Sequence, residues 1–169
     1  LLTVKEHLGR LKGIKMAYVG DGNNVCNSLM LGCAMVGMDL ACGCPKGYEP
    51  DPGVIEKARE IAGRNGCQLT LVEDPLEAAR GANVVYTDVW VSMGQEEEQK
   101  LREKIFKPYQ VNSRLMSVAD PKAIVMHCLP AHRGMEITDE VIDSERSVVL
   151  DQAENRLHAQ KAIMVALMS

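Results

Sequence analysis

The sequence predicts an α/β fold, with a Rossmann-like, three-layer, doubly wound and mostly parallel sheet in a single domain. Short apolar runs alternate with segments of helical periodicity, and turns rich in Gly, Pro and Asn separate them. The length of 169 residues, with 46% hydrophobic content, suffices for one core. We expect the first strand at the centre, so that the ends of strands one, four and five meet in one crevice. The expected strands cover residues 14–19, 38–44, 68–72, 82–87 and 123–126.

Capping residues and helix breakers place the helices. Thr3 and Glu6 match a capping box, and Asp74 before Pro75 matches an N-cap followed by proline at the first helical position. A short last strand is expected at 147–150. Helices are expected over 3–11, 24–35, 53–64, 75–80, 95–106 and 154–168, with a shorter irregular or helical piece at 111–119 and a brief helix after Thr138.

Composition excludes several classes of protein. The net charge of -4 and an aromatic content of 4% argue against nucleic-acid binding. We expect no membrane span and no secretory signal, and therefore a cytoplasmic protein. The six cysteines fall mostly inside apolar segments, which argues against a disulfide framework. Cys42 and Cys44 lack a second pair at zinc-finger spacing, so we expect no metal.

A glycine-rich turn follows the first strand and reads Gly20-Asp21-Gly22-Asn23-Asn24-Val25. A dinucleotide site would have a small residue where Val25 stands and an acidic residue after the second strand, so a nicotinamide-dependent dehydrogenase is disfavoured. The turn is typical of an Asn-capped helix start, or of an Asn23 or Asn24 amide presented to a small polar ligand.

Two further loops carry chemistry. Asp88 follows the fourth strand and suits an ammonium group, although a capping role fits equally well. Cys128 follows the fifth strand, where an acidified thiol would act as nucleophile, proton acceptor or ligand contact, whereas the plain alternative is a small buried hydrophobe. His127 is either a functional group or a structural histidine at the strand end whose ring nitrogens are hydrogen-bonded within the fold. Arg133 and Arg156 are candidate anion contacts.

Taken together, the loops are far more specific than any one of them. In order they read GDGNNV, PKGYEPD, DVWVSMGQE, MHCLPAHRG and DQAENRLHAQKA. This series resembles ornithine carbamoyltransferases, over essentially the whole chain but over only the carboxyl-terminal half of that enzyme. The resemblance implies that residues 1–169 form the ornithine-binding domain. The amino-terminal domain, whose Ser-x-Arg-Thr and His-Pro-x-Gln segments hold carbamoyl phosphate, is missing from this sequence.

The resemblance implies an ornithine site. Asn24 would bind the α-carboxylate of L-ornithine, with Asn23 as support. Asp88 and Ser92 would hold the α-amino group, helped by the main chain of Met93. The Ser-Met-Gly stretch favours ornithine over aspartate as substrate and also over putrescine or acetylornithine, which remain alternatives.

The resemblance also implies where the reaction takes place. Cys128 and Leu129 would line the reacting centre for carbamoyl phosphate, and Arg156 would reach the carbamoyl group. Cys128 and Arg156 are therefore the catalytic candidates, and no cofactor or metal is implied. The expected partners are the amino-terminal domain and, in the full-length enzyme, a homotrimer or a multiple of trimers. We expect the fragment alone to be inactive, so that a non-catalytic amino-acid-binding module remains the alternative.

Overall fold

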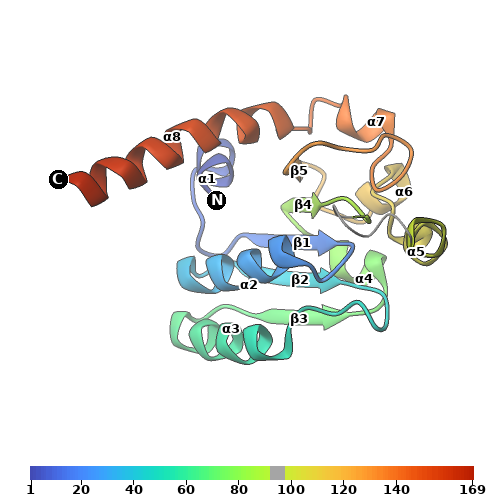
Figure 1. Cartoon of the computed structure of the whole chain (residues 1–169), viewed down its shortest axis with the longest axis horizontal. Coiled ribbons are helices and arrows are strands. Elements are labelled where there is room, and N and C mark those ends of the chain that lie inside the picture. The colour runs from blue at the N-terminus through green and yellow to red at the C-terminus, as the bar shows by residue number, and fades with distance from the viewer. Residues whose placement is uncertain (92–97) are drawn as a thin grey trace.

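The structure is a computed structural model that describes residues 1–91 and 98–169. Five parallel strands form one sheet in the order β3-β2-β1-β4-β5 (Figure 1). The first strand lies at the centre, and the predicted fold class is confirmed. The strands are β1 (Lys15–Val19), β2 (Asp39–Gly43), β3 (Leu69–Val72), β4 (Val84–Thr87) and β5 (Ile124–His127).

The described helices cover both faces of the sheet and one of its edges. None of them, within the part of the chain that is described, is apolar over a length that could cross a membrane. They are α1 (Leu2–Leu8), α2 (Asn24–Val36), α3 (Pro52–Asn65), α4 (Pro75–Ala79), α5 (Gln99–Phe106), the 3-10 helix η2 (Lys107–Tyr109), α6 (Ser113–Met116), α7 (Asp139–Ile142) and α8 (Val149–Met168).

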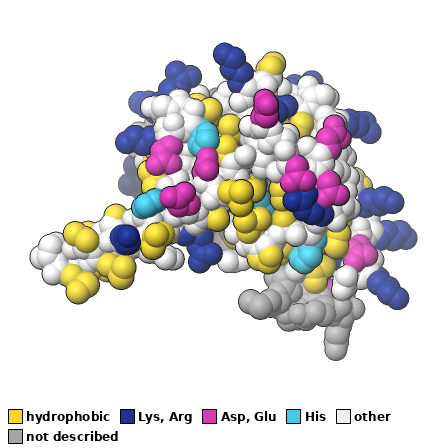
Figure 2. Space-filling model, turned by 90° about the horizontal axis from the view of Figure 1, so that it is seen from above, with side chains coloured by type: hydrophobic (Ala, Val, Ile, Leu, Met, Phe, Trp, Pro, Cys, Tyr) yellow, Lys and Arg dark blue, Asp and Glu magenta, His cyan; other side chains and the backbone are white. Residues whose placement is uncertain are grey.

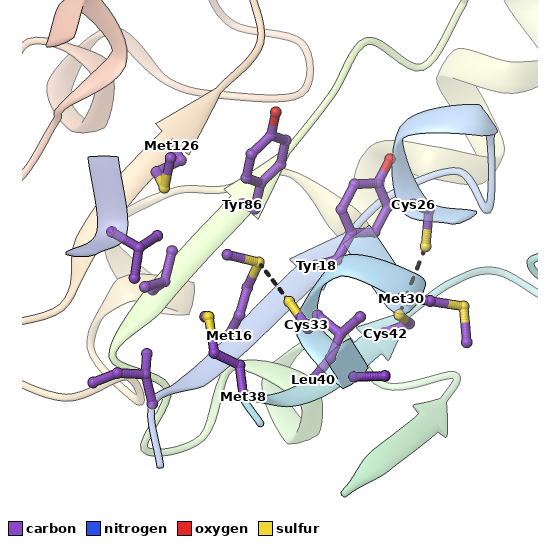
Figure 3. Close-up of a cluster of buried hydrophobic side chains, with 14 of the residues drawn as sticks. Met16, Tyr18, Cys26, Met30, Cys33, Met38, Leu40, Cys42, Tyr86 and Met126 are labelled. Atoms are coloured by element: carbon purple, nitrogen blue, oxygen red, sulfur yellow. Dashed lines mark hydrogen bonds between the residues drawn. The ribbon is translucent and has the colours of Figure 1, made fainter. Parts of the chain in front are cut away.

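The sheet separates two hydrophobic cores, as expected for three layers. Alternate residues of a strand point to opposite faces. Met16 and Tyr18 of β1 therefore pack into the core beneath α2 and α3, which Figure 3 shows in close-up. Ala17 and Val19 pack into the second core, with α4, α5 and α6. Both faces of the sheet are covered, which is why its strands read as continuous apolar runs.

The expected capping box at Thr3 is wrong. Thr3 lies inside α1, whose first turn has no side-chain cap, and it is buried. Its hydroxyl accepts a hydrogen bond from Nδ2 of Asn155 in α8, and the carboxylate of Glu6 accepts a second one at 2.6 Å. A capping box satisfies amides of its own helix, whereas these two side chains join α1 to α8.

The expected strand at residues 147–150 is also wrong. Ser147 forms only an isolated bridge to Val125, and α8 begins at Val149, five residues earlier than predicted. Val148 and Val149 are buried while Leu150 is 75% exposed. The apolar run that suggested a strand is therefore the start of a helix. In contrast, the predicted cap at Asp74 is confirmed, because its carboxylate accepts the Leu76 amide at 2.8 Å.

Candidate functional site

The carboxyl ends of β1, β4 and β5 lie side by side at one edge of the sheet. Val19, Thr87 and His127 are register partners, so the chain leaves all three strands at the same level. The Thr87 hydroxyl also donates to the Val19 carbonyl oxygen at 2.8 Å. The polar residues that follow these strands contact one another directly. The loops after the three strands also line one cavity, at the place where the strand order predicted a crevice.

Asp88 is the centre of these contacts. The residue is only 6% exposed, and both carboxylate oxygens accept hydrogen bonds. Oδ2 accepts from Nδ2 of Asn23 at 2.8 Å. Oδ1 accepts from its neighbour's amide, that of Val89, at 2.8 Å and from the thiol of Cys128 at 2.9 Å. The carboxylate is therefore held in one orientation by groups from three loops.

The two asparagines after β1 have different roles. Asn23 is the N-cap of α2: its Oδ1 accepts the amides of Val25 and Cys26 at 3.0 and 3.1 Å while its Nδ2 holds Asp88. A single side chain thus satisfies the helix start and fixes the carboxylate. Asn24 is exposed and faces a cavity. Its neighbour Gly22 must be glycine, since a Cβ there would lie 2.3 Å from the backbone of residues 49–50.

Cys128 is a proton donor here, and the expectation of an acidified thiol is wrong. Burial and the hydrogen bond and charge of Asp88 raise the pKa of the Cys128 thiol to about 12. A neighbouring carboxylate disfavours a thiolate, because two like charges would then lie in contact. At neutral pH the sulfur therefore keeps its proton and directs it at Asp88.

A buried carboxylate closes the loop that carries Cys128. His127 and Glu136 are both wholly buried, and Nε2 of the ring lies 3.1 Å from Oε1 of Glu136. The other ring nitrogen, Nδ1, accepts the amide of Leu129 at 2.9 Å. Glu136 also accepts the amide of His132, so one side chain binds both ends of the turn. Within it, Leu129 has a left-handed backbone with φ of 54°.

Asp88, His127 and Cys128 place three ligand-type atoms within 4.8 Å of one another. The arrangement does not suit a metal ion. Both ring nitrogens of His127 are already engaged, one by the Leu129 amide and the other by Glu136. Cys128 is a protonated thiol, whereas a metal ligand must be a thiolate. This group of residues is better explained as a hydrogen-bonded scaffold.

A cavity of about 580 Å³ opens beside this network. Its size suits a small organic ligand. Three predicted site residues, Asn24, Asp88 and Leu129, line it, whereas Cys128 does not line it but donates a hydrogen bond to Asp88. Sequence reasoning assigned no role to the other lining residues, which apart from His132 and Gln99 are apolar types without distinctive chemistry. They are Val25, Val89, Val91, Gln99, Pro130, His132 and Met135.

Two other predicted candidates, Arg133 and Arg156, do not line this cavity. Arg156 is exposed on α8, one residue after the buried Asn155. Ser92 and Met93 lie outside the described residues. The residue of α8 that contacts the ends of the strands is Gln152, whose side chain accepts a hydrogen bond from the His127 amide at 3.1 Å and donates one to the Tyr86 hydroxyl at 2.9 Å. A lone Gln on a helix gave no signal in the sequence.

Comparison with known proteins assigns a family to this arrangement. Residues 12–167 match the model described as "Aspartate/ornithine carbamoyltransferase, Asp/Orn binding domain". Curated relatives named ornithine carbamoyltransferase are 60% identical over 99% of this chain in Gloeobacter violaceus and 59% identical over 96% in Methanocaldococcus jannaschii. The chain spans 54% of the length of each of these two.

A solved structure agrees with the sequence relatives. The ornithine carbamoyltransferase from Pyrococcus furiosus superposes with a TM-score of 0.93 at 55% identity, over 96% of this chain and 52% of that one. The fold and the sequence identity indicate the same family. The chain belongs to the aspartate/ornithine carbamoyltransferase family and corresponds to its Asp/Orn-binding domain.

Proposed function

We propose that this chain is the ornithine-binding half of an ornithine carbamoyltransferase. The reaction joins the δ-amine of L-ornithine to the carbonyl carbon of carbamoyl phosphate, breaks the bond to the phosphate oxygen and gives L-citrulline and phosphate. The observation that carries the proposal is the fixed carboxylate of Asp88 on the wall of a ligand-sized cavity that the exposed residue Asn24 also lines.

The proposed ligand contacts follow from the charges of an amino acid. A buried carboxylate whose hydrogen bonds come from a side-chain amide, a main-chain amide and a thiol keeps its negative charge available to an ammonium group, and charge-assisted hydrogen bonds are strong. We assign the α-amino group to Asp88 and, outside the described residues, to Ser92 and Met93. Asn24 at the first turn of α2 is assigned to the α-carboxylate, where the positive end of the helix dipole favours an anion.

The proposed chemistry requires removal of a proton. An alkylamine has a pKa of about 10, so the δ-ammonium must lose a proton before it attacks the carbonyl carbon. The Cys128 thiol and Asp88, 2.9 Å apart, form a pair that can relay it. The sulfur would take the amine proton as its own proton passes to Asp88. Holding both substrates in line contributes further, since orientation can supply about 7–11 kcal/mol.

The proposal includes a second domain. The chain covers about half of its relatives' length, and its cavity offers one fixed carboxylate but, among the described residues, no arginine or lysine for a phosphate. We assign carbamoyl phosphate binding to the other half of the protein, with Cys128 and Leu129 forming this chain's side of the reacting centre. Arg156, exposed on α8, would reach the carbamoyl group once that half is in place.

The direct test is citrulline formation by the full-length protein. We expect activity with L-ornithine and carbamoyl phosphate, and little with putrescine or N-acetylornithine. The 169-residue chain alone should form no citrulline. A full-length protein that carbamoylates only putrescine or acetylornithine would replace ornithine as the substrate, and activity of the chain alone would contradict the assignment of carbamoyl phosphate to a second domain.

A matched pair of variants tests the site itself. Asn24→Ala should raise the KM for ornithine about tenfold, because it removes one hydrogen-bonding group from the ligand. Asn27→Ala is the control: it lies on the same helix, but its side chain accepts the Asp51 amide at 3.1 Å and does not line the cavity. Equal effects of the two variants would show that helix stability, and not ligand contact, is being measured.

A further inference from the structure

We propose that Arg102 is a positioning residue for ornithine, because its guanidinium holds together two of the loops that line the cavity. Arg102 lies in α5, does not line the cavity and was not singled out in the sequence. The inference rests on the proposed function for the identity of the ligand. The contacts that carry it are independent of that function.

Two polar contacts join Arg102 to loops on either side. Its Nη2 donates to the carboxylate of Asp21, in the turn between β1 and α2. Its Nε donates to the carbonyl oxygen of Trp90 at 2.6 Å, in the loop after β4. The side chain is only 4% exposed, so both bonds form away from water and neither is readily replaced by solvent.

Aromatic rings complete the environment of the guanidinium. Its carbon lies 4.9 Å from the ring centre of Tyr48, in the loop between β2 and α3, and 5.1 Å from that of Phe106. Cation–π contacts of this kind are most favourable when the cation is desolvated. Tyr48 is itself tied to the first loop, since its carbonyl oxygen accepts the Gly22 amide at 2.8 Å. One buried cation thus bonds to or stacks on three loops.

Two of these loops, the one after β1 and the one after β4, line the cavity. Trp90 stands between Val89 and Val91, which both line the cavity, and Asp88 immediately precedes them. Asp21 comes three residues before Asn24, the other polar lining residue. A shift of the guanidinium would therefore move Asn24 and Asp88 relative to each other. These are the two groups assigned to the opposite charges of the amino acid.

Lysine cannot replace arginine in this position. An ammonium group can contact Asp21, but it has no planar fork to bond Asp21 and Trp90 together while stacking on two rings. Arg102→Lys therefore keeps the charge and removes the geometry. Arg146 provides a matched control, since it donates to the carbonyl oxygens of Ala123 and Asp120, both at 2.8 Å, at the opposite end of the sheet.

The test compares Arg102→Lys with Arg146→Lys in the full-length protein. We expect Arg102→Lys to raise the KM for ornithine about tenfold, with kcat and the KM for carbamoyl phosphate changed by less than about threefold. Hydrogen exchange should quicken at residues 20–24 and 88–91. Arg146→Lys should quicken exchange near residues 120–125 and leave every kinetic constant unchanged. If Arg102→Lys does not fold, Asp21→Asn takes its place, with a smaller rise in the KM for ornithine.

The outcomes separate this inference from the proposed function. Wild-type protein that forms no citrulline overturns the proposed function and this inference with it. An active wild type with an unchanged KM for ornithine in Arg102→Lys, or in Asp21→Asn where that variant is used, overturns the positioning role alone. The same holds if both arginine variants lose thermal stability equally and neither changes the KM for ornithine, since Arg102 would then act only in folding.

Discussion

The carboxyl edge of the sheet and the outer half of α8 are built in opposite ways. At the sheet edge, buried polar groups such as Asp88, His127 and Glu136 are held by hydrogen bonds from this chain itself. Along the outer part of α8, residues 156–169 are all exposed. The helix extends away from the body of the molecule, and Figure 2 shows apolar side chains along this extension (Figures 1 and 2).

The outer part of α8, residues 156–169, presents an apolar face. Leu157, Met164 and Met168 recur at i, i+7 and i+11, which places them on one side of a helix. They are 52%, 54% and 86% exposed. An apolar helical face of this kind marks a binding surface for another protein segment. The comparison teaches that the polar network at the sheet edge is satisfied by groups of this chain, whereas the outer part of α8 leaves its apolar face uncovered, and we expect the proposed second domain to cover it.

The largest effect is expected at Asp88. Asp88→Asn keeps the shape but removes the charge, so in the full-length protein kcat/KM for ornithine should fall about 10²–10⁴-fold. Steady-state citrulline formation measures it. Asp74→Asn is the control, because Asp74 only caps α4 and Asn caps equally well. Near-normal activity of Asp88→Asn would remove the carboxylate from the proposed mechanism.

A loss of stability is expected next, at Glu136. Glu136→Ala leaves the His127 ring and the His132 amide without their acceptor inside the protein, so the free energy of unfolding should fall by about 3 kcal/mol. Urea denaturation measures it. Asp143→Ala breaks the exposed pair with Arg133 and should leave the midpoint nearly unchanged. If the two variants are equally stable, the buried carboxylate is not the clamp of this loop.

A smaller effect is expected on α8, and it depends on the partner. Leu157→Glu combined with Met164→Glu should leave the unfolding midpoint of the 169-residue chain unchanged, because both side chains are exposed there. In the full-length protein the same change should lower stability by about 2 kcal/mol for each side chain that the second domain buries. Differential scanning calorimetry of both forms is the measurement. Ala166→Glu, nine residues after Leu157 and therefore on the opposite side of the helix, is the control, and equal losses in both forms would argue against a docking face.

The smallest effect is expected on the reactivity of Cys128. With a pKa of about 12, the thiol is protonated at neutral pH, so alkylation by iodoacetamide should be slow at pH 7 and accelerate continuously up to pH 10. Asp88→Asn removes the anion that opposes the thiolate, so the pKa of Cys128 should fall and alkylation at pH 8 should quicken about tenfold. Mass spectrometry of the Cys128 peptide measures both rates. A rate that reaches a plateau near pH 7 would mean that the thiol is acidified after all.

Much of the fold could be predicted because local signals agreed with the final packing. All five strands were found from apolar runs that end in turn residues, and the caps at Asn23 and Asp74 follow from Asx residues before a helix. The failures came where one pattern fits two structures. Thr3 with Glu6 matches a capping box but binds Asn155 across 149 or more residues of chain, and residues 147–150 read equally as a strand or a helix start.

The sequence by itself determined the order of strands and helices, the loops that carry chemistry and, through their motifs, the family. Only the tertiary structure decided what those loops do together. The bond from Asn23 to Asp88 spans 65 residues, and that from Cys128 to Asp88 spans 40. No local pattern encodes such contacts, because they depend on the register of β1, β4 and β5. The protonation of Cys128 followed from the same cause, since a thiol's pKa depends on burial and on the charge placed beside it.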